Sequence, residues 1–67
     1  MTSADKTWAC NRLAAFARDA RELEASTYRW YSASYSTSAR LAALHATVAA
    51  LYEAAQAEIA ATPVGDV

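Results

Sequence analysis

The residues that could take part in chemistry are few in this chain. It has one cysteine, Cys10, and one histidine, His45, so it can form neither an internal disulfide nor a zinc site of Cys and His ligands. A single histidine with no second ligand or nucleophile nearby is typical of a structural side chain. Cys10 is expected to pack as a small apolar residue. We therefore predict no metal site and no cofactor.

The seven carboxylates also lack the surroundings of an active site. They are spread along the chain and are expected to be solvated. Acid–base catalysis by two carboxylates needs a cleft that separates their pKa values, and two helices offer none. The only glycine is Gly65, so no glycine-rich loop can hold a phosphate. The sequence thus predicts no catalytic residue and no enzyme.

The charge balance disfavours nucleic acid as a partner. Six basic and seven acidic residues give a net charge of −1. Proteins that bind nucleic acids neutralise several phosphates with clustered Lys and Arg side chains. Here the basic residues lie among acids between residues 6 and 40. A small DNA-binding or antitoxin-like regulator remains as an alternative that charge does not favour.

Nothing in the sequence predicts export or membrane insertion. Residues 1–6 contain no apolar run of the kind found in signal peptides. The most apolar stretch, residues 41–61, includes Glu53 and Glu58, whereas a spanning helix needs ~20 strongly apolar residues. We expect a cytoplasmic protein. The 19 alanines, and five arginines against one lysine, are typical of a GC-rich genome such as that of a bacterium or phage.

Helix is the only regular structure that the composition favours. No Pro or Gly precedes Pro63, and Ala, Leu, Arg and Glu are strong helix formers. Ser and Thr side chains compete for backbone hydrogen bonds and predict a bend where they cluster. We predict one helical domain over residues 1–67, with helices over 4–31 and 38–61, a bend over 32–37 and a frayed tail over 62–67.

Polar residues suited to cap both helices stand at their predicted starts. Ser and Thr hydroxyls at this position accept hydrogen bonds from free amides of the first turn. The first helix can use Thr2 or Ser3. The second can use Ser36, Thr37 or Ser38.

Apolar residues recur in steps of four and three through both predicted helices. This heptad spacing is typical of helices that pack at shallow angles. The repeat of the first helix also includes Ala9, Ala20, Thr27 and Trp30. The larger members are predicted to form the core: Leu13, Phe16, Leu23, Leu41, Leu44, Val48, Leu51 and Ile59.

The two repeats match when the chain folds back at Ser34. Leu44 then lies opposite Leu23, and Leu51 lies opposite Phe16. We therefore predict an all-α protein, an antiparallel two-helix hairpin. The heptad spacing also runs through the bend without a skip. A single long helix that pairs with a second copy in an antiparallel coiled coil is therefore the alternative.

The second predicted helix has more apolar surface than one partner helix can cover. The twelve residues between Arg40 and Glu53 include no acidic residue, Lys or Arg, and a helix that is apolar all round is usually buried. Chains below about 70–80 residues often gain stability by oligomerisation, so we expect two hairpins to form a four-helix bundle. The predicted second contact surface is a line of alanines: Ala43, Ala46, Ala50, Ala54 and Ala57.

An aromatic cluster surrounds the predicted bend. Trp, Tyr and Arg are the residue types enriched at binding hot spots. The same side chains could instead close the end of a core made mostly of alanine. The cluster consists of Tyr28, Arg29, Trp30, Tyr31 and Tyr35.

Together these features predict a small, non-catalytic helical module for protein–protein interaction. It would be a structural, adaptor or regulatory subunit, including a phage or bacterial accessory protein that binds a host protein. Its partner would be a second copy, another protein, or both. A membrane-surface amphipathic protein is the other alternative, although interfacial helices usually carry a polar face rich in Lys and Arg. Neither membrane nor nucleic acid is an expected partner.

Overall fold

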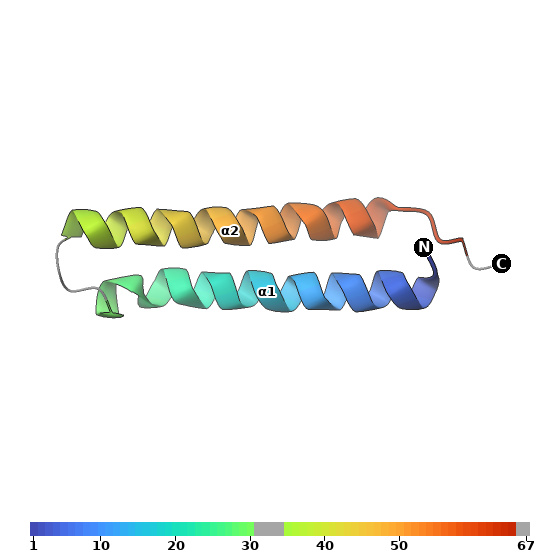
Figure 1. Ribbon diagram of the computed structural model, residues 1–67, viewed down its shortest axis with the longest axis horizontal. Coiled ribbons are helices and arrows are strands. Elements are labelled where there is room, and N and C mark those ends of the chain that lie inside the picture. The colour runs from blue at the N-terminus through green and yellow to red at the C-terminus, as the bar shows by residue number, and fades with distance from the viewer. Residues whose placement is uncertain (31–34, 66–67) are drawn as a thin grey trace.

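Two long helices make up nearly all of the described part of the chain (Figure 1). The computed structural model describes residues 1–30 and 35–65, with side chains described for residues 1–27 and 37–65. Helix α1 covers Ser3–Trp30, and helix α2 covers Tyr35–Ala61. They run side by side in opposite directions, so the N-terminus lies beside the end of α2. The predicted antiparallel hairpin is confirmed, in place of the single long helix.

A predicted cap fixes the start of α1. The backbone N–H of Asp5 donates to Oγ1 of Thr2 over 3.1 Å, which satisfies one of the free amides in the first turn. Asp5 itself lies in that turn, where the helix dipole favours a negative charge.

Helix α2 begins earlier than the sequence predicts. The bend was expected over residues 32–37, but Tyr35, Ser36 and Thr37 are helical, so none of the three expected caps stands at the start of α2. The weak helix propensity of Ser and Thr is overridden here by packing, because Ser38 is only 2% exposed. Residues 31–34 lie outside the described residues.

Helix α2 ends at Ala61, and the segment over residues 62–65 forms hydrogen bonds with the start of α1. Nζ of Lys6 donates to the carbonyl of Thr62 over 2.8 Å. The backbone N–H of Gly65 donates to the carbonyl of Met1 over 2.8 Å. These hydrogen bonds close the end of the hairpin that lies opposite the bend.

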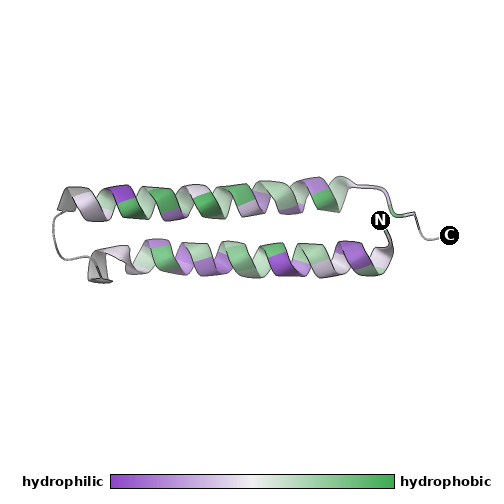
Figure 2. Ribbon diagram, in the orientation of Figure 1, coloured by the Kyte–Doolittle hydropathy of each residue, from purple (hydrophilic) through white to green (hydrophobic). Residues whose placement is uncertain are grey.

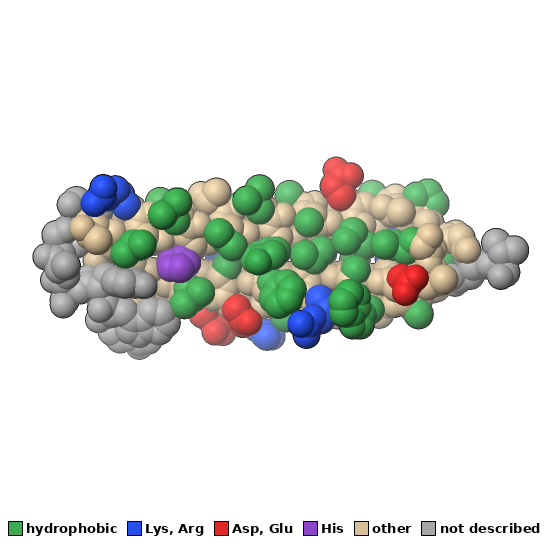
Figure 3. Space-filling model, in the orientation of Figure 1, with side chains coloured by type: hydrophobic (Ala, Val, Ile, Leu, Met, Phe, Trp, Pro, Cys, Tyr) green, Lys and Arg blue, Asp and Glu red, His purple; other side chains and the backbone are tan. Residues whose placement is uncertain are grey.

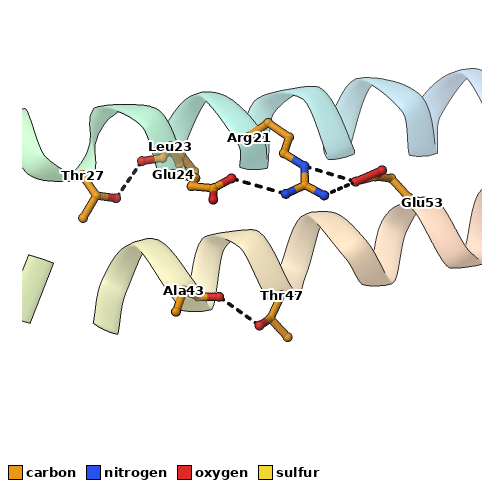
Figure 4. Close-up of polar contacts among 7 residues, drawn as sticks. All are labelled: Arg21, Leu23, Glu24, Thr27, Ala43, Thr47 and Glu53. Atoms are coloured by element: carbon orange, nitrogen blue, oxygen red, sulfur yellow. Dashed lines mark hydrogen bonds and ion pairs between the residues drawn. The ribbon is translucent and has the colours of Figure 1, made fainter. Parts of the chain in front are cut away.

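The interior between the helices is built from small residues. Its apolar members are Ala17, Ala20, Ala42 and Ala49, and Ala49 has no exposed surface. Thr27 is also fully buried, and its hydroxyl donates to the carbonyl of Leu23 over 2.7 Å (Figure 4). Small residues along a contact line let two helix backbones come close.

The predicted core is therefore wrong for most of its larger members. Leu13, Leu41 and Ile59 are half-buried. The other five are exposed in this chain: Phe16 by 39%, Leu23 by 37%, Leu44 by 61%, Val48 by 41% and Leu51 by 65%.

The error is a displacement of the contact line, because the heptad step itself is retained. In α2 the buried line passes through Ser38, Ala42 and Ala49. This line lies one residue away from the predicted line through Leu44 and Val48. The helices meet along the small residues, so the larger side chains are left at the edge of the contact.

Candidate protein interaction surface

The contact with α1 divides the rest of α2 into two exposed sides. Ala49 marks the centre of the contact. At about 100° per residue, Leu44, Val48 and Leu51 lie on one side of that centre. The predicted alanine surface lies on the other side, with Ala46 half-buried and the rest exposed: Ala43, Ala46, Ala50, Ala54 and Ala57. Both apolar lines predicted for α2 therefore lie beside the fully buried line through Ala42 and Ala49, and not on it.

Helix α1 adds large side chains to the leucine side. Phe16 and Leu23 are seven residues apart, which is nearly two full turns, so they lie on one line of the helix. The ring of Phe16 meets the ring of Tyr52 in α2, with centroids 5.5 Å apart and planes tilted by 41°. Tyr52 takes the position opposite Phe16 that was expected for Leu51.

These side chains form one continuous surface, which we call the apolar face. Figure 3 shows hydrophobic side chains along the length of this broad side of the rod, over both helices. Near the bend, a shallow hollow on α2 is lined by Thr37, Arg40, Leu41 and Leu44. The apolar face consists of Phe16, Leu23, Leu44, Val48, Leu51 and Tyr52.

Trp8 and Arg12 extend this surface toward the N-terminus. The guanidinium of Arg12 lies 5.1 Å from the ring centroid of Phe16 and 6.0 Å from that of Trp8, within cation–π range. Trp8 is 67% exposed in the single chain. Because Trp and Arg are enriched at binding hot spots, this pair is suited to contact a partner. This cation–π contact is not among the predicted ones, although the spacing of four from Trp8 to Arg12 and from Arg12 to Phe16 places the three side chains along one side of α1.

The opposite side of the hairpin carries a polar contact between the helices. Arg21 donates from Nη2 and Nε to Oε1 of Glu53, over 2.7 and 3.2 Å, and from Nη1 to Oε1 of Glu24 over 3.3 Å (Figure 4). The hydrogen bond to Glu53 raises the pKa of the Arg21 guanidinium above its ordinary value, and the bond to Glu24 adds to this shift. The group is solvated, so water screens this contact.

The aromatic cluster predicted at the bend is not described by the structure. The side chains of Tyr28, Arg29, Trp30 and Tyr35 are outside the described part, and so is the whole of Tyr31. Their role in partner binding stays a prediction.

The residues considered first for chemistry lie apart from one another. Cys10 is half-buried, with its Sγ atom 4.0 Å from the carbonyl oxygen of Gln56, and His45 is half-buried in α2. Among the described residues, no three His, Cys, Asp or Glu side chains are grouped to hold a metal ion. In the same part of the chain, neither helix combines the length and apolarity needed to cross a membrane.

Comparison with known proteins assigns no family to this chain. No family model matches it, and neither a curated protein nor a solved structure matches it. Helical hairpins serve many unrelated functions, so the function has to be argued from the exposed surface.

Proposed function

We propose that the chain is a small, non-catalytic interaction module that packs its apolar face against another protein. One observation carries this proposal. Among its described side chains, the hairpin fully buries only small residues and leaves several larger apolar side chains exposed, among them Leu44 by 61% and Leu51 by 65%. A contiguous exposed apolar surface is typical of a protein interaction site.

The total exposed surface supports the same proposal. A compact protein of this mass, 7.2 kDa, is expected to expose about 4,100 Å². The hairpin exposes 4711 Å². The surplus follows from the elongated shape of the hairpin, and a partner packed along it would cover part of this surface.

The alanine surface is a second place where a helix could pack. Its methyl groups would allow a close approach between backbones. However, the free energy gained by burial rises with the apolar area removed from water. A leucine such as Leu51 offers more area than Ala50, so we place the main contact on the apolar face.

The narrower assignments from the sequence stay predictions. They describe a structural, adaptor or regulatory subunit, including a phage or bacterial accessory protein, and a cytoplasmic location. Among the residues whose side chains the structure describes, the exposed cations near the apolar face are Arg12 and Arg40. Because a membrane surface or nucleic acid is usually bound by a larger basic cluster, a protein partner is favoured.

A capture experiment with two neighbouring substitutions tests this function. Leu51→Glu places a charge on the apolar face, and Ala50→Glu places the same charge on the alanine surface. Immobilised wild type and Ala50→Glu are expected to retain the same proteins from an extract of the native host, and Leu51→Glu is expected to lose them.

The same three proteins are then mixed with anionic liposomes and with duplex DNA. We expect neither to bind. The proposal is contradicted if Leu51→Glu retains the same proteins as the wild type, or if liposomes or DNA bind through the apolar face instead.

A further inference from the structure

Building on the proposed function, we infer that the partner on the apolar face is a second copy of this chain. The two hairpins pack face to face, with α2 of one copy antiparallel to α2 of the other. Their bends then lie at opposite ends of a four-helix bundle. Three features of the described residues support this arrangement.

The first feature is the size of the face. The hairpin measures 55 by 14 Å across its broad side, which is the side seen in Figure 3. The outline of this side, taken between Cα atoms, is of the same order as the roughly 800 Å² of accessible surface that each partner buries in a standard stable interface. A second hairpin has the same length and width, so it can cover the whole face.

The second feature is the symmetry of the apolar stripe on α2. We define this stripe as Leu44, Val48 and Leu51 of the apolar face together with the half-buried Ala55, which lies next along the same line of α2; these four follow one another in steps of four, three and four. This order reads the same in both directions and is centred between residues 49 and 50. An antiparallel copy about that centre places Val48 opposite Leu51 of the second copy, and Leu44 opposite Ala55, so that larger and smaller side chains can interdigitate.

The third feature is a pair of opposite charges beside this stripe. Arg40 and Glu58 are both exposed. They are 18 residues apart, or about five full turns, so they lie on the same line of α2. Their midpoint is Ala49, within half a residue of the centre of the stripe. The antiparallel copy therefore brings Arg40 next to Glu58 of the second copy, and two-fold symmetry makes this ion pair twice.

The alternative packing of two copies would separate these charges. If both bends lay at one end, α2 of one copy would face α1 of the other. Arg40 and Glu58 of the second copy would then be about 27 Å apart along the bundle. A charge exchange between these two positions therefore distinguishes the two arrangements.

Sedimentation equilibrium of charge variants tests the inference. Arg40→Glu and Glu58→Arg each place like charges together and are expected to raise the dimer dissociation constant about tenfold at low salt. The double variant Arg40→Glu with Glu58→Arg restores opposite charges and is expected to return to within about twofold of wild type. Circular dichroism checks that each variant keeps its helix content.

Three outcomes are distinguishable when Leu51→Glu is measured alongside. Rescue by the double variant supports the antiparallel dimer. A dimer that Leu51→Glu dissociates, but that the double variant does not rescue, overturns the antiparallel order and leaves the proposed function intact. A wild type that stays monomeric overturns the second copy as partner, and the capture experiment then decides the proposed function by itself.

Discussion

The interior of the hairpin and its apolar face differ in a way that reverses the usual order of a small protein. The interior holds alanines, a threonine and a serine, whereas the apolar face holds leucines, valine and aromatic residues. Burying a side chain such as leucine stabilises a protein by about 1.5–3 kcal/mol, and an alanine has far less area to bury. Trp8, Leu44 and Leu51, which are 67%, 61% and 65% exposed, therefore stabilise the single hairpin little, and a partner that covers them would add hydrophobic stabilisation.

The hydropathy of the two helices gives the same contrast. In Figure 2 apolar residues predominate along most of α2 after its first turns, while α1 alternates between polar and apolar segments. A helix that is apolar on several sides needs more than one neighbour. Helix α1 supplies one neighbour, and the apolar face supplies the place for another.

The largest effect on the hairpin itself is expected from enlarging its interior. Ala49→Leu adds volume at a position with no exposed surface, and overpacking of this kind typically costs about 1–3 kcal/mol. Thermal unfolding at low protein concentration measures this loss. An unchanged midpoint would mean that the helices are not in close contact along the alanine line.

The opposite change on the apolar face should have a different outcome. Leu44→Ala removes a side chain that is 61% exposed, so the isolated hairpin should change by no more than about 0.5 kcal/mol. Self-association should weaken about tenfold or more, because each dimer loses two leucine contacts.

The same variant can contradict the comparison between interior and face. A loss of about 2–5 kcal/mol in the dilute monomer, as for leucine truncation in a core, would place Leu44 inside the hairpin after all. Unfolding at several concentrations separates the two effects.

A smaller loss is expected at the end of α1. Thr2→Ala removes the hydroxyl that accepts from Asp5, and the loss of such a cap typically costs about 1 kcal/mol. Because the interior of the hairpin is small, losing this capping hydrogen bond should measurably lower the midpoint of thermal unfolding. Thr2→Ser keeps an acceptor at the same place and serves as the control that should behave like wild type.

The smallest effect is expected on the side opposite the apolar face. Glu53→Gln removes the charge that pairs with Arg21 over 2.7 Å. Because this contact is solvated and screened, the thermal midpoint should fall less than it does for Thr2→Ala. Added salt should reduce the difference from wild type further. A larger fall, unaffected by salt, would mean that the ion pair and not the alanine line holds the helices together.

The sequence predicts the hairpin because its signals are local. Pro63, the serine-rich centre and the capping hydroxyl of Thr2 each act within a few residues. Heptad spacing also predicts that the helices lie along one another. The sequence predicts too late a start for α2, because the helix propensities of Ser36 and Thr37 carry no information on the packing around Ser38.

Which side of each helix faces inward could not be read from spacing alone. Leucine and alanine both recur at heptad steps in α2, and we assigned the interior to the larger residues such as Leu44 and Leu51. The contact between α1 and α2 forms along Ala42 and Ala49 instead. The larger residues are then left available for a second contact, outside the hairpin. The sequence does show that two apolar lines exist, but only the fold shows which side remains exposed.

The most direct test of this account is sedimentation equilibrium of two neighbouring variants, Leu51→Glu and Ala50→Glu. They carry the same new charge, one on the apolar face and one on the alanine surface. We predict that wild type and Ala50→Glu form dimers, and that Leu51→Glu sediments as a folded monomer with unchanged helix content. Dissociation by Ala50→Glu, with an intact Leu51→Glu dimer, would contradict the account and assign the interface to the alanine surface.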